Sequence, residues 1–137
     1  MWIKKLIRKY VNIGDAKMNV VAIGDNAFKG YIYLKKLIVG SNVKSIGKNA
    51  FYGCKSLSNV AIGENTRRIG DNCFSKCSNL RKMDIYSTYL TKTSVRKCAF
   101  KGIYSKALIK VPARCLKSYK SLMVLRGISK KAKITSR

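Results

Sequence analysis

The chain has 137 residues, of which 47% are hydrophobic, and it carries 30 Lys and Arg against 5 Asp and Glu, a formal net charge of +25. This apolar content suffices for one buried core and excludes a disordered chain in spite of the high charge. Histidine is absent, which removes Ser-His, Cys-His and His-metal chemistry, and five scattered carboxylates offer no acid-base pair. The sequence therefore predicts no enzyme, no cofactor and no metal site.

The first residues follow a helical spacing. Trp2, Ile3, Leu6, Ile7 and Tyr10 fall on one face, and basic residues lie between them. The spacing predicts an N-terminal capping helix, with a basic amphipathic helix at a membrane surface as the alternative. Charges interrupt the apolar run too often for the roughly 7 to 15 apolar residues of a signal peptide. No stretch of the chain approaches the roughly 20 apolar residues of a transmembrane helix.

The next segment is interpreted as a partial structural unit. Val11 to Gly14 is typical of the end of a strand, and Asp15 to Asn19 is a lengthened connection before Val20.

A motif of the form Ile-Gly-x-Asn-(Ala or Cys)-Phe then recurs at intervals of 23 residues, beginning at Ile23, Ile46 and Ile69. The apolar strand pattern Leu34-x-x-Leu37-x-Val39 recurs in the same phase. A repeat of roughly 20 to 29 residues is typical of a solenoid, in which stacked coils bury alternate strand residues between them. The glycine after each isoleucine predicts either a positive φ or a close backbone approach.

The unit spelled out between Ile46 and Ile62 resembles the BspA-type leucine-rich repeat of bacterial surface proteins. The resemblance is close from Val20 to Ile85 and looser toward the C-terminus, although Gly40 and Gly63 stand where the family usually has proline. It implies a right-handed leucine-rich-repeat coil with short parallel strands. It also implies secretion or wall attachment and a role in adhesion.

A fourth, degenerate unit follows an insertion. Phe100 lies 26 residues after Phe74, so three extra residues fall near Tyr86 to Thr93, and the unit ends at Pro112, the only proline. The array is therefore expected to hold about four repeats of 23 residues.

Beyond Pro112 the period changes from strand to helix. Leu116, Tyr119, Leu122 and Met123 are spaced as on one helical face, and Gly127 is expected to end the helix. This predicts a C-terminal cap helix followed by a short strand at residues 132–134. The expected organisation is a single domain: residues 1–19 are an N-terminal cap and partial repeat, 20–42, 43–65 and 66–88 are repeats, 89–112 is the degenerate repeat, and 113–137 is the C-terminal cap.

Alignment of the units predicts which side chains share a surface. Lys36, Asn59, Lys82 and Leu108 form an outward column of the strand face, with Ile38, Ala61, Asp84 and Lys110 in the neighbouring column. Lys44 stacks on Arg67 and Ser45 on Arg68, which gives a basic edge. The ligand-binding candidates are Lys36, Asn59, Lys82, Lys44, Arg67 and Arg68. Asp25, Lys48 and Asp71 share another column, in which stacked opposite charges would pair for structural reasons.

The cysteines and tyrosines each allow two interpretations. The five cysteines show no metal spacing and are expected to be buried thiols, with a Cys54–Cys77 disulfide in an exported protein as the alternative. Tyr31, Tyr33, Tyr52 and Tyr86 fall near turns, where they would either contact a ligand or pack at the edge of the core.

Three functions follow from these features. The first is a monomeric, non-enzymatic binding or adhesion module of a bacterial surface protein that recognises a protein or acidic glycan. The second is a small cytoplasmic protein that binds nucleic acid or another polyanion through charge alone, without sequence specificity. The third is a purely structural C-terminal cap of a longer array. With no export signal the chain alone would be cytoplasmic, whereas as the end of a longer exported precursor it would be extracellular or surface-bound; the second case is favoured.

Overall fold

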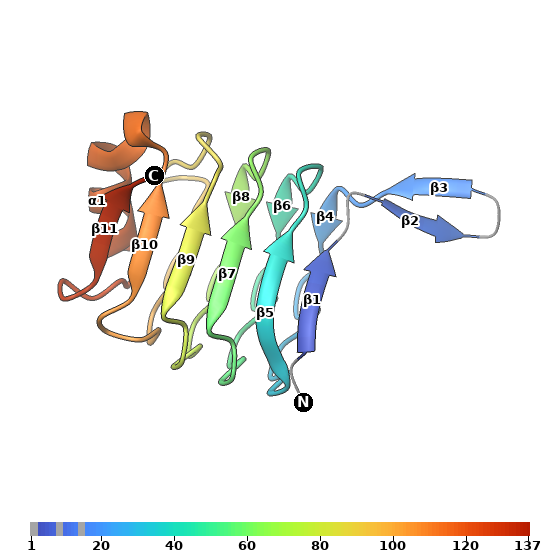
Figure 1. Cartoon of the computed structure of the whole chain (residues 1–137), viewed down its shortest axis with the longest axis horizontal. Helices are drawn as coiled ribbons and strands as arrows, with labels where there is room; N and C mark the ends of the chain where they lie inside the picture. Colours follow the sequence, from blue (N-terminus) through green and yellow to red (C-terminus); the bar gives the residue numbers. More distant parts are fainter. Residues whose placement is uncertain (1–2, 8–9, 14–15) are drawn as a thin grey trace.

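The computed structural model describes residues 3–7, 10–13 and 16–137, with side chains described from residue 20 onward. Its coils stack along one axis, and each central coil contributes one strand to each of two parallel sheets (Figure 1). The longer sheet has the order β1-β5-β7-β9-β10-β11 and the shorter has the order β4-β6-β8. The longer sheet consists of β1 (Ile3–Ile7), β5 (Leu34–Val39), β7 (Asn59–Ile62), β9 (Lys82–Ile85), β10 (Leu108–Val111) and β11 (Lys133–Ser136). The shorter one consists of β4 (Ala22–Ile23), β6 (Ser45–Ile46) and β8 (Arg68–Ile69).

The expected repeat solenoid with short parallel strands is therefore confirmed, and its register is the one that the repeats predict. Leu37 aligns with Val60, and Val60 aligns with Met83. In the shorter sheet Ile46 lies between Ile23 and Ile69. All of these side chains are buried, because alternate residues of each strand face the interior.

The N-terminal segment differs from the prediction. Residues 3–7 form strand β1, which pairs in parallel with β5, so the expected capping helix and its membrane-surface alternative are both wrong. Trp2 lies outside the described residues. Residues 10–13 are also not the end of a sheet strand: β2 (Tyr10–Ile13) and β3 (Ala16–Asn19) pair antiparallel as a separate hairpin. This hairpin extends away from the coils (Figure 1).

Four phenylalanines stack through the interior of the coils. The ring centroids of Phe28 and Phe51 are 5.3 Å apart, those of Phe51 and Phe74 are 5.3 Å apart, and those of Phe74 and Phe100 are 6.1 Å apart, all with nearly parallel planes. Phe51, Phe74 and Phe100 are fully buried, whereas Phe28, the first member, is partly buried. The column therefore runs through every coil that carries the motif.

Backbone hydrogen bonds hold this column at the spacing of the coils. The N–H of Phe51 donates to the carbonyl of Cys73, and the N–H of Phe74 donates to the carbonyl of Ala99. Asn49 and Asn72 adopt positive φ values of 56° and 53°, which asparagine tolerates better than most residues. The asparagine that recurs two residues before each of these phenylalanines thus forms a turn in which alternate N–H groups point at the next coil.

Of the two alternatives predicted for the glycine that follows each isoleucine, a positive φ or a close backbone approach, the structure shows the close approach at Gly47 and Gly70. A Cβ on Gly47 would lie 2.5 Å from the backbone nitrogen of Asp25, and one on Gly70 would lie 2.5 Å from that of Lys48. Any side chain at these positions would push adjacent coils apart.

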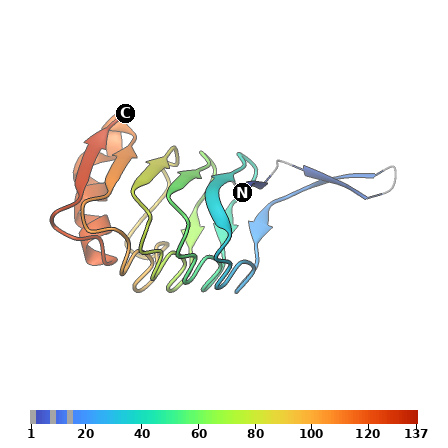
Figure 2. The same ribbon diagram turned by 60° about the horizontal axis from the view of Figure 1, so that its bottom comes forward.

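The C-terminal end is closed by a short 3-10 turn η1 (Ala113–Cys115), the helix α1 (Leu116–Leu125) and strand β11. Tyr119, Leu122 and Met123 are buried against the last coil, and Gly127 follows the helix with φ 104°. The N–H of Phe100 donates to the carbonyl of Arg126, so the cap continues the hydrogen-bond ladder between coils. The predicted cap helix and following strand are confirmed (Figure 2).

Phe51→Ala should remove a ring that is stacked on both sides and cost about 3 to 5 kcal/mol of unfolding free energy. Phe28→Ala is the matched control and should cost less, because Phe28 is only partly buried at the end of the column. Urea unfolding of both variants measures the difference. Equal losses would contradict the stacking order.

A chain that ends at Pro112 should aggregate, because removal of the cap uncovers the strand edge of β10 and the apolar end of the last coil. Light scattering and thermal melting test this outcome. A monomeric truncated chain with an unchanged melting curve would show that residues 113–137 do not cap the fold.

Candidate functional site

The outward column of the longer sheet lies in the predicted register. Lys36 pairs with Asn59, and Asn59 pairs with Lys82. Lys36 and Lys82 are exposed and Asn59 is half-buried. The Lys82 ammonium lies 4.0 Å from a carboxylate oxygen of Asp84 in the neighbouring column, which reduces the positive charge there. This face is therefore mixed in charge rather than continuously basic.

The basic edge lies beside the shorter sheet. The N–H groups of Arg67 and Arg68 both donate to the carbonyl of Lys44, at 2.7 and 3.1 Å, and Arg68 pairs with Ser45 in the register of β6 and β8. The side chains of Lys44, Arg67 and Arg68 are exposed. Stacked coils thus bring like charges together at about the 4.7 to 4.9 Å spacing of neighbouring strands, an arrangement that favours an anionic ligand.

Tyr89, from the insertion, lies beneath one of these cations. The Arg67 guanidinium is 4.2 Å from the centre of the Tyr89 ring, and 45% of Tyr89 is exposed. A cation over an aromatic face is stabilised by the ring quadrupole, and the guanidinium keeps N–H groups available for a ligand. The contact orients Arg67, and it was not predicted because Tyr89 lies in an irregular insertion.

A polar groove of about 400 Å³ runs across the shorter sheet. Arg68 lines it together with Lys48 and Arg96, and hydroxyl groups of the coil connections complete its wall. The polar lining residues are Asp25, Ser45, Lys48, Arg68, Asp71, Thr93, Ser94 and Arg96.

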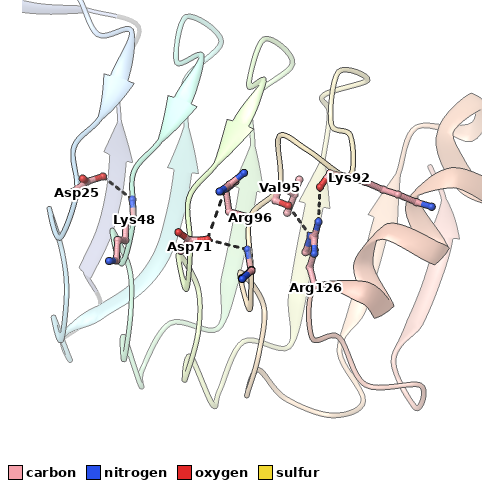
Figure 3. Close-up of polar contacts among 8 residues, drawn as sticks. Asp25, Lys48, Asp71, Lys92, Val95, Arg96 and Arg126 are labelled. Atoms are coloured by element: carbon pink, nitrogen blue, oxygen red, sulfur yellow. Dashed lines mark hydrogen bonds and ion pairs between the residues drawn. The ribbon is translucent and has the colours of Figure 1, made fainter.

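The two carboxylates of this groove are engaged by the backbone (Figure 3). Asp25 Oδ1 accepts a hydrogen bond of 2.7 Å from the N–H of Lys48, and Asp71 Oδ1 accepts one of 3.0 Å from the N–H of Lys97. The Arg96 Nε also lies 3.9 Å from Asp71 Oδ1. The column of Asp25, Lys48 and Asp71 is thus structural, as predicted, but its carboxylates bind N–H groups of the following coil, a contact that charge alternation did not predict.

The six predicted site residues form two groups. Lys36, Asn59 and Lys82 lie on the longer sheet, whereas Lys44, Arg67 and Arg68 lie at the shorter sheet. The second group is the denser one and adjoins the groove through Arg68.

The cysteines are free thiols, and Cys54, Cys73, Cys77 and Cys115 are buried. The Sγ atoms of Cys54 and Cys77 donate to the carbonyls of Phe28 and Phe51, each at 3.1 Å. A hydrogen bond with Cys77 lowers the pKa of Cys54, while that hydrogen bond and burial raise the pKa of Cys77. Burial raises the pKa of Cys73 well above its ordinary value. Across the described part of the chain, no three His, Cys, Asp or Glu side chains are grouped to hold a metal ion.

Three other tyrosines also contact cations: Tyr86 is exposed, whereas Tyr52 and Tyr104 are half-buried. The Arg137 guanidinium lies 3.5 Å from the centre of the Tyr86 ring, and that of Arg81 lies 4.1 Å from the centre of the Tyr104 ring. The ammonium groups of Lys29 and Lys76 lie 5.7 and 5.4 Å from the centre of the Tyr52 ring, and a hydrogen bond with the Tyr52 hydroxyl raises the pKa of Lys76. Contacts between a tyrosine ring and a cation thus occur at several places on the surface.

The insertion is tied to the cap by buried polar contacts. The Tyr119 hydroxyl donates to the carbonyl of Ser87 and accepts a hydrogen bond from the N–H of Leu90, both at 3.0 Å. The Arg126 guanidinium donates through Nε to the carbonyl of Val95 at 2.7 Å and through Nη2 to the carbonyl of Lys92 (Figure 3). The irregular loop is therefore held in one position against the helix.

Stacked parallel strands with this repeat define a leucine-rich-repeat solenoid. The family model of the BspA type leucine-rich repeat region matches residues 9–122 in six copies, and the chain belongs to that family.

Solved structures show the same fold. A leucine-rich repeat protein from Bacteroides ovatus is 24% identical with a TM-score of 0.69, over 96% of this chain and 33% of that one. A leucine-rich cell surface protein from Faecalibacterium prausnitzii is 22% identical with a TM-score of 0.50, over 96% of this chain and 42% of that one. The chain thus spans less than half the length of either. No curated protein matches it. None of the helices in the part of the chain that the structure describes has the length and apolar character of a membrane span.

Tyr119 gives the loop contact a pH signature. Burial raises the pKa of Tyr119 to about 12, above an ordinary value of 10. The fold thus favours the neutral phenol, so this contribution to stability is complete below pH 10 and is lost as pH rises from 10 to 12. Over that range the wild type should lose about 2 kcal/mol more unfolding free energy than Tyr119→Phe does. Urea unfolding at pH 9 and pH 11.5 measures the difference, and parallel losses would contradict it.

Proposed function

We propose that the chain is a non-enzymatic binding module of a bacterial cell-surface protein and that it recognises a protein or acidic glycan. The observation that carries the proposal is the basic edge: Lys44, Arg67 and Arg68 are exposed on adjacent coils, and Arg68 also lines a polar groove. Family membership supports a surface repeat protein, and the ligand is inferred from the surface chemistry of this chain.

Geometry makes the basic edge more selective than the net charge alone. The backbone ladder fixes the spacing of the stacked backbone positions that carry these cations, and the Tyr89 ring orients the Arg67 guanidinium. A ligand with anionic groups at a matching spacing would contact several cations at once, and the orientation of Arg67 by Tyr89 lowers part of the entropic cost of binding.

The groove provides the second part of this surface. The cationic side chains of Arg68 and Lys48 are suited to a sulfate or carboxylate of the ligand. Ser45, Thr93 and Ser94 supply hydroxyl groups suited to a polar ligand. Backbone N–H groups already donate hydrogen bonds to Asp25 and Asp71, and the Arg96 Nε lies 3.9 Å from Asp71 Oδ1. Three cations, Lys48, Arg68 and Arg96, line the same groove and offset these two acids. The groove therefore remains suited to an anion despite its two acids.

The strand face contributes less. Lys82 lies close to Asp84, and Asn59 accepts a hydrogen bond from the Ser58 hydroxyl through its Oδ1 atom. Lys36, Asn59 and Lys82 thus act as a secondary contact surface in this proposal.

The net charge of +25 supports a second candidate, a polyanion-binding protein without a shaped site. Such a protein would bind heparin, nucleic acid and anionic vesicles comparably, and all three would dissociate together as salt rises.

The double variant Lys44→Ala with Arg67→Ala tests the two candidates against Lys130→Ala with Lys131→Ala, a control that removes the same charge from exposed cap residues. Heparin affinity, measured by calorimetry in physiological salt, should fall at least about tenfold in the first variant, the loss expected for 1.4 kcal/mol, and less than twofold in the control. Lys36→Ala with Lys82→Ala should have an intermediate effect.

Equal losses in all three variants, together with complete dissociation in physiological salt, would favour the polyanion candidate. If the chain binds neither heparin nor extracellular matrix proteins in low salt, both binding candidates are excluded. The structural role, as the end of a longer array, would then be the remaining candidate.

A further inference from the structure

A second hollow lies between the insertion and the cap helix, on residues that the basic edge does not include. This loop-helix groove has a volume of about 480 Å³, within the range of about 300 to 1,000 Å³ that small-molecule sites occupy. One wall is the loop at residues 90–92, and the other consists of η1 and α1. The lining residues are Leu90, Thr91, Lys92, Arg114, Lys117, Ser118, Tyr119, Ser121 and Leu122.

The walls are fixed in place before any ligand binds. The Tyr119 hydroxyl bonds to two backbone groups of the loop, and Arg126 holds the carbonyl of Lys92 from the far end of the helix. Arg114 donates from Nη2 to the Thr88 hydroxyl at 2.9 Å, so the loop is joined to η1 as well. A site held by these contacts would lose little conformational entropy on binding.

The groove combines an apolar floor with a cationic rim. Leu90, Tyr119 and Leu122 are each no more than 5% exposed and form the floor, whereas the side chains of Lys92, Arg114 and Lys117 line the rim around it. None of the lining residues is acidic, and the last acid of the whole sequence is Asp84. Three cations over low-dielectric walls concentrate positive potential on the groove.

We propose that the loop-helix groove binds a small amphiphilic anion, whose anionic head group contacts Lys92, Arg114 and Lys117 and whose short apolar chain lies on Leu90, Tyr119 and Leu122. The site is independent of the macromolecular ligand proposed for the basic edge. Its chemistry excludes a cation and disfavours an anion that has no apolar part.

Calorimetric titrations with octanoate and octyl sulfate test this proposal, and acetate and octylammonium serve as matched probes that lack the chain or reverse the charge. The anionic chains should bind, and both matched probes should bind at least about tenfold more weakly. NMR titration of the amide signals should place the largest shifts at Ser118, Ser121 and Thr91, which line the groove.

Two variants locate the site. Lys92→Ala with Lys117→Ala should weaken octanoate binding at least about tenfold, while the equal-charge control Lys130→Ala with Lys131→Ala should weaken it less than twofold. Ser121→Trp places an indole in the groove from an exposed position and should abolish binding with an unchanged melting curve. Equal affinity for octanoate and octylammonium, equal affinity for octanoate and acetate, or unaltered binding in both groove variants would each overturn the proposal.

Discussion

Backbone hydrogen bonds between coils are the constraint on which the rest of this structure depends. Each motif turn directs N–H groups at the carbonyls of the next coil, and the glycine at its start lets the two backbones come within contact distance. The phenylalanine column then fills the interior at the spacing that these bonds impose. Because the ladder leaves so little freedom, a residue at one repeat position must lie beside its equivalent in the neighbouring coil.

Because of this constraint, charged residues that lie one repeat apart in the sequence become neighbours on one surface. Lys44 and Arg67 are 23 residues apart in the sequence and adjacent in the fold, where their like charges repel each other. Tyr89 offsets part of that cost by accepting the Arg67 guanidinium on its ring face. Asp25 and Asp71 hold the next coil through its N–H groups rather than through lysine side chains. A surface that retains stacked cations in this way is suited to an anionic ligand, which would relieve the remaining repulsion.

The parts that follow the repeat could be predicted from sequence, and the parts that break it could not. Register fixed the neighbours of Lys36 and Ile46, as well as the burial of Phe51, because one period determines them all. The apolar positions of residues 3–7 fit a helical as well as a strand period in so short a segment, and pairing with β5 makes the segment a strand. The groove beside α1 depends on Tyr119 and Arg126 meeting an irregular loop, a contact between segments with no shared pattern.

The amide hydrogen of Lys76 offers the most direct test of the ladder. The Lys76 side chain is exposed and its φ is 59°, yet its N–H donates to the carbonyl of Lys101 in the next coil at 2.8 Å. Native-state hydrogen exchange should therefore give this amide an opening free energy within about 1 kcal/mol of that for global unfolding. Exchange at the rate of an unprotected peptide would contradict the claim that bonds between coils hold the fold together.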